Sequence, residues 1–222
     1  MDNPDVSPRV SADRLRTFIS QAFQRAGLPA DHAYVLGELI AEADLRGTDT
    51  HGVFRMPLYV RRIKAGGINV RPNIRIVEEQ ASTALVDGDN AMGHLVMRFA
   101  AHAAIAKARE TGVGWVGARM SNHAGPAALY AMMPLAHDMI GLYFAVGSNN
   151  HLPPTGSAEA LLGTNPIAVD PGQPGARRGD GHGANRRGFW QGTAQGGARR
   201  ADAGRLDDRP RRPPAHRCQA RR

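Results

Sequence analysis

The stretch Gly112-Val113-Gly114-Trp115-Val116-Gly117 decides between two kinds of α/β fold. Its glycine spacing matches GxGxxG, the fingerprint of Rossmann folds that bind dinucleotides. That fingerprint follows a strand and opens a helix, so that the pyrophosphate meets the helix N-terminus. Here an alanine-rich helical pattern at residues 95–109 precedes the glycines, and an apolar run at residues 113–118, which predicts a buried strand, spans them. We therefore reject a Rossmann nucleotide site at this stretch.

The chain on either side of this stretch alternates between helical and strand patterns, which predicts a mixed α/β (α+β) class. We expect a turn at Asp87-Gly88-Asp89 and an early helix end at Pro134. The expected helices cover residues 12–26, 29–46, 53–64, 95–109 and 125–136, and the expected strands cover residues 74–77, 83–86, 113–118, 140–146 and 165–169.

The composition changes abruptly at Asp170. Residues 170–222 hold 13 Arg and no Lys, Glu, Ile, Val or Met, so the whole net charge of +8 lies in this tail. We expect residues 1–169 to form the N-terminal part of one domain and the tail to be disordered, because it has little apolar surface to bury. Two interpretations stay open: a basic arm, or a segment translated out of frame. Several codons can encode each residue of the tail. When such codons are read one base later, they permit an amino-acid sequence like that of an ordinary enzyme.

Composition also limits the location of the protein. No apolar run approaches the length needed to span a bilayer, and the N-terminus lacks the pattern of a signal peptide. Cys218 is the sole cysteine, so no intramolecular disulfide can form. We expect a cytoplasmic protein without a membrane segment. We also expect no metal site, because the histidines are not accompanied by a cluster of carboxylates or thiols.

A polar, glycine-punctuated segment at residues 44–55 is the first candidate site. His51 can exchange a proton near neutral pH, and Arg46 or Arg55 can hold a carboxylate through the bidentate guanidinium fork. The alternative is a helix N-cap at Asp49 or Thr50 with solvated arginines.

Ser121-Asn122-His123-Ala124-Gly125 follows a predicted strand and is the second candidate, because α/β proteins place chemistry at the carboxyl ends of strands. The alternative for His123 is a histidine that caps the next helix. His94, His102, His137 and His151 stand alone in the sequence, and we interpret them as structural or exposed.

Two further turns, Gly147-Ser148-Asn149-Asn150 and Gly163-Thr164-Asn165-Pro166, are rich in backbone donors and small amides. They can face a phosphate or a nicotinamide amide, or they can be plain turns.

Taken together, these segments resemble the malate/L-lactate dehydrogenase family, which includes ureidoglycolate, sulfolactate and diketogulonate oxidoreductases. The resemblance covers residues 11–169, and Thr50 stands where the family usually has serine. It rests on three motifs in order, namely Asp44-Leu45-Arg46-Gly47 with Thr50-His51-Gly52 and Arg55, then Ser121-Asn122-His123-Ala124-Gly125, then Leu162-Gly163-Thr164-Asn165-Pro166-Ile167-Ala168.

The resemblance implies a non-Rossmann, NAD- or NADP-dependent enzyme that acts on a small 2-hydroxy or 2-keto acid, with a homodimer in intact relatives. It also implies that the present chain is incomplete and inactive, with a frameshift near codons 169 to 171. The implied site residues are His51 and His123 for acid/base chemistry, Thr50, Arg55 and Arg46 for substrate, and Asn149, Gly163, Thr164, Asn165 and Pro166 for cofactor.

A rival function rests on the tail alone. Its arginines can neutralise phosphates, and Phe189-Trp190 can stack on bases. It shows no regular Arg-Gly-Gly or Arg-Ser repeat, so we expect contact with nucleic acid only as non-specific binding through the tail.

Overall fold

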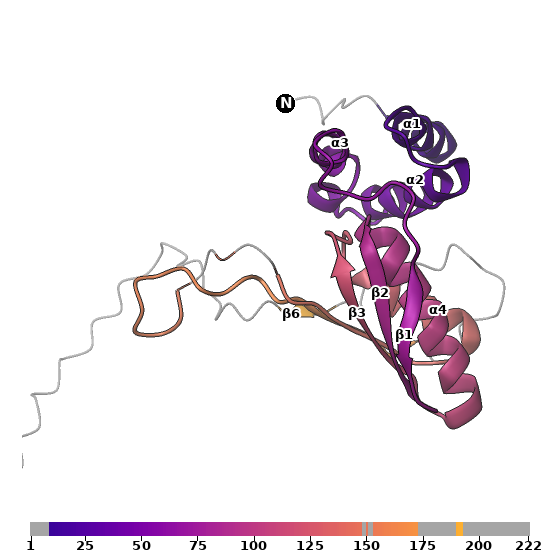
Figure 1. Cartoon of the computed structure of the whole chain (residues 1–222), viewed down its shortest axis with the longest axis vertical. Helices are drawn as coiled ribbons and strands as arrows, with labels where there is room; N and C mark the ends of the chain where they lie inside the picture. Colours follow the sequence, from indigo (N-terminus) through magenta and orange to yellow (C-terminus); the bar gives the residue numbers. More distant parts are fainter. Residues whose placement is uncertain (1–8, 148–149, 151–152, 173–189, 193–222) are drawn as a thin grey trace, which may run out of the picture.

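The computed structural model describes residues 9–147, 150, 153–172 and 190–192. Two parts stand out in Figure 1: a layer of helices, and below it a sheet with a long helix beside it. The helices are α1 (Ala12–Arg25), α2 (Ala30–Leu45), α3 (Met56–Lys64), α4 (Gly93–Thr111) and α5 (Ala128–Ala131), with 3₁₀ turns η1 (Asp49–His51), η2 (Val53–Arg55) and η3 (Met133–His137). The strands are β1 (Arg75–Glu79), β2 (Thr83–Ala91), β3 (Trp115–Ser121), β4 (Gly141–Phe144), β5 (Ile167–Asp170) and β6 (Trp190–Gly192).

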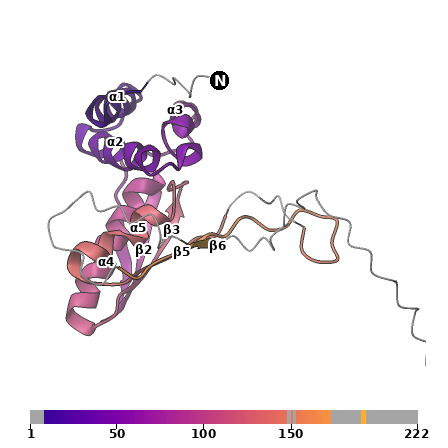
Figure 2. The same ribbon diagram turned by 180° about the vertical axis from the view of Figure 1, so that it is seen from behind.

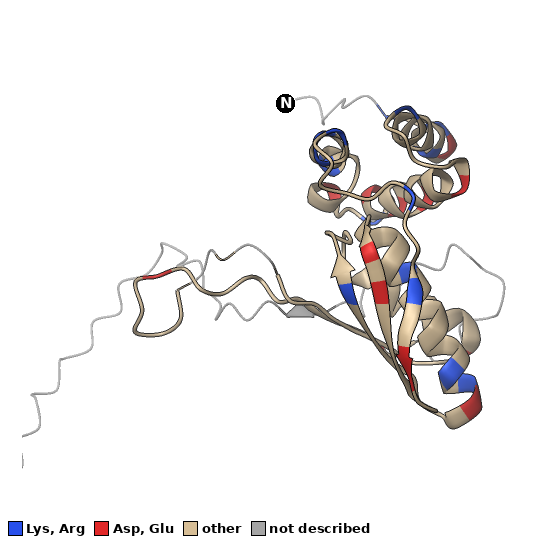
Figure 3. Ribbon diagram, viewed as in Figure 1, with Lys and Arg blue, Asp and Glu red and all other residues tan. Residues whose placement is uncertain are grey.

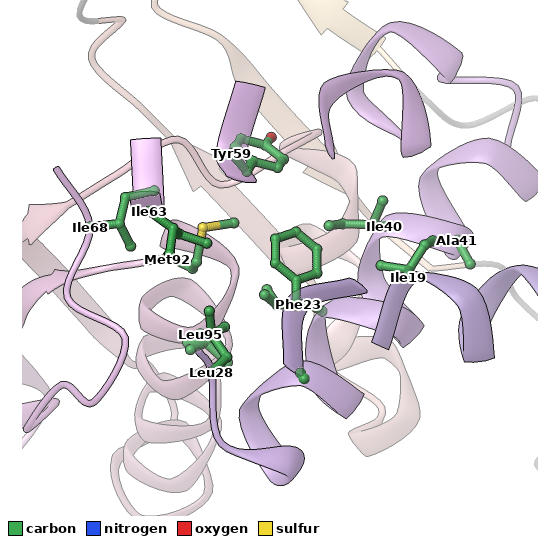
Figure 4. Close-up of a cluster of buried hydrophobic side chains, with 12 residues drawn as sticks. Ile19, Phe23, Leu28, Ile40, Ala41, Tyr59, Ile63, Ile68, Met92 and Leu95 are labelled. Carbon is green, nitrogen blue, oxygen red and sulfur yellow. The ribbon is translucent and has the colours of Figure 1, made fainter. Parts of the chain in front are cut away.

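The helical layer follows the sequence prediction closely. Ser11 occupies the N-cap position of α1, and Gly27 takes a φ of +106° after its C-terminus, a conformation that favours glycine. The apolar faces of α1, α2 and α3 meet the start of α4 in one core. Figure 4 shows the Phe23 ring among the labelled side chains of this core, which include Ile40, Tyr59, Met92 and Leu95.

The main sheet has the strand order β1-β2-β3. Strand β1 pairs antiparallel with β2, whereas β2 pairs parallel with β3. Helix α4 makes the crossover between the two parallel strands and packs on them both. A parallel pair requires such a crossover, and a helix is its usual form. The carboxyl end of β3 therefore lies at the edge of the sheet nearest the helical layer (Figure 1).

The glycine-rich stretch divides as the sequence predicts. Gly112 ends α4 with a φ of +84°, and Trp115 to Gly117 lie within β3. No helix opens from these glycines, so the rejection of a Rossmann fingerprint is confirmed, as is the mixed helix and strand class.

Two expectations for this sheet are wrong. Asp87-Gly88-Asp89 is not a turn, because β2 continues to Ala91 through an irregular register. Asp89 and Asn90 adopt positive φ there, which asparagine and aspartate tolerate better than most residues. Strand β3 is not fully buried, since it lies at a sheet edge and Trp115 is 60% exposed.

The second sheet, in the order β4-β5-β6, is antiparallel. The strand expected at residues 165–169 forms as β5, and it pairs with β6, which lies inside the tail that we expected to be disordered. The helix expected at residues 125–136 is interrupted: α5 ends at Ala131, and η3 continues through Pro134, whose ring is incompatible with a longer α-helix. Except for β6, the tail beyond Gly172 lies outside the described residues, and so does its expected disorder.

In the part of the chain that the structure describes, no helix is long and apolar enough to cross a membrane.

Phe23→Ala should lower the free energy of unfolding by about 3–5 kcal/mol, because it empties a fully buried ring position in the helical core. Denaturant titration of both proteins measures the difference. Phe18→Ala is the matched control on the same helix. Phe18 is 54% exposed, so we expect a change within about 0.5 kcal/mol. Equal losses for the two variants would contradict the assignment of the core.

Candidate active site

The polar segment after α2 is folded around the Asp44 carboxylate. Asp44 Oδ2 accepts a hydrogen bond of 2.8 Å from the backbone N–H of Val53. A side chain at position 52 would collide with the same carboxylate and would have to displace it from its contact with Val53. Burial raises the pKa of Asp44, partly offset by the Val53 hydrogen bond. The segment therefore forms the two successive 3₁₀ turns η1 and η2, which fix the positions of His51 and Arg55.

His51 and His123 come together although 71 residues separate them in the sequence. Their rings stack with centroids 5.5 Å apart and an interplanar angle of 28°. His51 reaches this position from η1, and His123 reaches it from the segment that follows β3. The two candidate motifs thus form one site, at the junction of the helical layer and the carboxyl end of β3.

Each imidazole has a hydroxyl partner. Thr50 Oγ1 lies 2.9 Å from His51 Nδ1, and Tyr59 Oη lies 2.7 Å from His123 Nδ1. The backbone N–H of Gly125 also donates to His123 Nδ1, over 3.3 Å. Gly125 has a φ of +75°, and a Cβ there would lie 2.7 Å from His94 Nε2. Glycine is therefore needed at this bend.

The surroundings favour the neutral form of both imidazoles. Burial lowers the pKa of His51, and the positive charge of Arg55 lowers it further. For His123 the loss of hydration is again the first cause of a lowered pKa, followed by the charges of His51, Arg55 and Arg62. His123 is nevertheless an exposed residue, so water still reaches it. A neutral imidazole keeps a lone pair on one ring nitrogen and a proton on the other, so it can accept or donate a hydrogen bond.

A third histidine lies behind these two. His94, at the start of α4, is fully buried and meets the Tyr59 ring edge-on at 5.7 Å. Burial first, and then the charges of His123 and His51, lower the pKa of His94 to about 3. Both of its ring nitrogens are buried with no hydrogen-bond partner among the described residues. The sequence interpretation of His94 as structural or exposed did not foresee that it backs the site.

Tyr59 was not anticipated either. In the sequence it is one apolar position of an amphipathic helix, and its ring is buried in the helical core. Its hydroxyl is the part that reaches His123. No pattern in the sequence distinguishes such a tyrosine from an ordinary core residue.

The two candidate arginines differ in their surroundings. Arg46 Nε pairs with Glu42 Oε1 at 2.7 Å, one turn back on α2, which agrees with the alternative of a solvated arginine. Arg55 Nε donates to the backbone carbonyl of Thr50 over 2.8 Å. Arg55 also depresses the pKa of both stacked histidines, so its charge acts on the site. An anion beside His51 and His123 would meet the Arg55 guanidinium.

The expected cofactor segment lies apart from this cluster. The backbone N–H of Gly147 donates to Asn165 Oδ1 over 2.8 Å, and a side chain at Gly163 would collide with the Gly147 carbonyl. Thr164 and Pro166 lie on the same stretch of chain, which contacts Gly147 and its neighbours through backbone atoms and then continues into β5. Figures 1 and 2 show the chain before β5 extending away from the helical layer. No described interaction joins it to the histidines, and Asn149 lies outside the described residues.

Within the described ranges, no group of three or more His, Cys, Asp or Glu side chains is arranged to hold a metal ion. Charges of both signs are mixed over the helices and the main sheet in Figure 3.

Comparison with known proteins agrees with this architecture. A family model described as malate/L-lactate dehydrogenase matches residues 10–178. The malate dehydrogenase of Pyrococcus horikoshii is 44% identical over 161 residues, which are 72% of this chain and 44% of that protein. Its solved structure matches with a TM-score of 0.71 at 42% identity, over 76% of this chain and 49% of that one.

Two further relatives carry other substrate names. The L-sulfolactate dehydrogenase of Methanocaldococcus jannaschii is 38% identical over 69% of this chain and 44% of that protein. The ureidoglycolate dehydrogenase (NAD(+)) of Escherichia coli is 32% identical over 72% of this chain and 46% of that protein. The chain therefore spans about half the length of the curated relatives it matches.

His94 should make the stability of the fold depend on pH. Its folded pKa of about 3 lies below the unfolded value near 6.5, so the unfolded chain binds the proton more readily. The free energy of unfolding should therefore fall as the pH drops below about 6.5, by up to roughly 1.4 kcal/mol per pH unit for this one group. His94→Leu should remove that part of the slope between pH 5 and 6.5 in denaturant titrations.

His102→Leu is the control for this slope, because His102 is exposed on the same helix. We expect it to change the slope less than His94→Leu does. Indistinguishable slopes for the wild type and His94→Leu would show that His94 is not buried in the neutral form.

Proposed function

Because the chain belongs to the malate/L-lactate dehydrogenase family, we propose that the stacked histidines form the proton-transfer part of a 2-hydroxyacid dehydrogenase. The observation that supports this most directly is the pair His51 and His123, held 5.5 Å apart beside Arg55. Malate and sulfolactate are acted on by relatives, and both carry a carboxylate next to a hydroxyl-bearing carbon. A guanidinium beside two neutral imidazoles matches that chemistry.

Each residue of the cluster has a separate part. Arg55 binds the substrate carboxylate with its terminal nitrogens, while its Nε stays on the Thr50 carbonyl. Thr50 can hydrogen-bond the substrate or orient His51 through Nδ1. One imidazole takes the hydroxyl proton when the alcohol is oxidised and returns it when the keto acid is reduced. Arg46, paired with Glu42, contributes less to substrate binding in this arrangement.

A nicotinamide cofactor, NAD or NADP, is the second part of the proposal. A relative named as NAD(+)-dependent supports it, and the nicotinamide ring supplies the hydride acceptor when bound. Gly147 and Gly163 approach one another closely through their backbones, and Asn165 Oδ1 accepts the Gly147 N–H, which gives this turn a fixed set of backbone and amide groups. Gly163, Thr164, Asn165 and Pro166 would hold the cofactor together with Asn149.

The abrupt change of composition at Asp170 is the third part of the proposal. The composition of the tail differs from that of a folded domain, and its codons, when read one base later, permit sequence like that of the family. We therefore propose a one-base frameshift near codons 169 to 171. We also propose that the chain of 222 residues is inactive. The family match extends to residue 178, a few residues past Asp170. Sequencing the DNA across codons 165 to 180 tests the frameshift. A cytoplasmic homodimer is the form we propose for the frame-corrected protein.

Binding of nucleic acid through the arginine-rich tail is the alternative function, and it rests on the tail's net charge of +8. Binding that weakens steeply with salt, and disappears when residues 173–222 are deleted, would favour it.

In a frame-corrected enzyme, His51→Ala and His123→Ala should each lower turnover of L-malate or L-sulfolactate with NAD or NADP. A positioned acid/base group contributes roughly 10²–10⁴-fold to rate. His102→Ala is the control, since His102 is exposed on α4 and outside the cluster. His94 is unsuitable as a control because it packs against Tyr59. Full turnover by both site variants would remove the support for this proposal.

Arg55→Lys should mainly raise KM in the same enzyme. Lysine keeps the positive charge but loses the planar fork and the Nε contact with Thr50. Steady-state kinetics should show a larger rise in KM than fall in kcat. Arg61→Lys, at an exposed position of α3, is the matched control and should leave both constants unchanged. A fall in kcat alone would assign Arg55 a role other than carboxylate binding.

A further inference from the structure

The hydrogen bonds at His123 Nδ1 restrict the proton on this ring to one nitrogen. A backbone N–H can only donate, so the contact from Gly125 requires a lone pair on Nδ1. The Tyr59 hydroxyl, 2.7 Å from the same atom, must then also act as the donor. In a neutral imidazole with an unprotonated Nδ1, the proton resides on Nε2.

We propose that Tyr59 is a positioning residue that, together with the Gly125 N–H, holds His123 in the neutral tautomer protonated at Nε2. Nδ1 is then occupied by the protein, and Nε2–H is the group left to meet a ligand. His123 thus presents a hydrogen-bond donor to a substrate oxygen.

The environment of the Tyr59 hydroxyl supports this direction of donation. Burial raises the pKa of Tyr59, so the hydroxyl keeps its proton. The Tyr59 ring is fixed in the core beside Ile63 and Met92, and the His94 ring lies edge-on against it. The donor therefore cannot move away from His123 without disturbing the core.

The charged groups around His123 also favour a ring that carries only one proton. Arg55 from η2 and Arg62 from α3 carry positive charge beside it, and His51 from η1 would repel it when protonated. His94 from α4 lies behind Tyr59. His51, Arg55 and Arg62 all disfavour a second proton on the ring. None of the groups that shift its pKa is a carboxylate that would stabilise an Nδ1–H.

A division of roles between the two histidines follows, and this part rests on the proposed function. The partner of His51 Nδ1 is the Thr50 hydroxyl, which can donate or accept. Both tautomers of His51 are therefore available, and a ring of that kind can take up and release a proton at its other nitrogen. His51 would transfer the proton, and His123 would polarise the substrate oxygen as a neutral donor.

Nitrogen-15 NMR of the imidazoles in the 222-residue chain tests the tautomer without any activity assay. At neutral pH, His123 Nδ1 should resonate as a pyridine-type nitrogen and Nε2 as a pyrrole-type nitrogen, with the signals assigned through their loss in His123→Gln. A protonated Nδ1 in the neutral wild-type ring would overturn the proposal, whatever the dehydrogenase activity proves to be.

Tyr59→Phe tests the part played by the tyrosine, because it keeps the ring in the core and removes one of the two donors. We expect the tautomer ratio of His123 to shift toward Nδ1–H by roughly five- to tenfold, the effect of one net hydrogen bond. Tyr34→Phe, at a tyrosine that is 61% exposed, is the matched control and should leave the ratio unchanged. An unchanged ratio in a folded Tyr59→Phe would overturn the role of Tyr59.

Discussion

Tyr59 is the residue through which the two halves of this fold constrain one another. Its ring is 2% exposed within the helical core, and its hydroxyl lies 2.7 Å from a histidine that follows β3. Burying the ring fixes the helical layer against the start of α4, and the polar tip must then find a partner. His123 is that partner. The site therefore lies where it does because the core and the end of the sheet share one side chain.

Close backbone approach is the second constraint. Gly52 lies against the Asp44 carboxylate, and Gly93 lies against the backbone carbonyls of Asn122 and His123. A side chain at position 93 would push against the backbone that carries His123, and one at position 52 would displace the Asp44 carboxylate that holds the segment of His51. These glycines therefore determine how near the segments can come, and the stacking of the rings depends on that distance.

The electrostatics of the cluster follow from this packing. Three histidines and a tyrosine are gathered where water is partly excluded, with Arg55 beside them. Burial and like charge both oppose protonation, so the imidazoles stay neutral. The Arg55 guanidinium stays charged and gives the site its attraction for anions. A family of enzymes that act on hydroxy acids fits a site of this composition.

The sequence by itself determined the mixed class, most of the helices, the absence of a Rossmann fingerprint and the family resemblance, because these depend on local periodicity and short motifs. It also identified His51, His123 and Arg55 as candidates. It could not show that Asp87 to Asp89 continue a strand, because the local preference of these residues for a turn is overridden by their pairing with β3. Only the tertiary structure brought His51 onto His123, set His94 and Tyr59 behind them, and paired Arg46 with Glu42. Those relations join residues far apart in the chain or depend on which face a helix buries, and no local pattern records them.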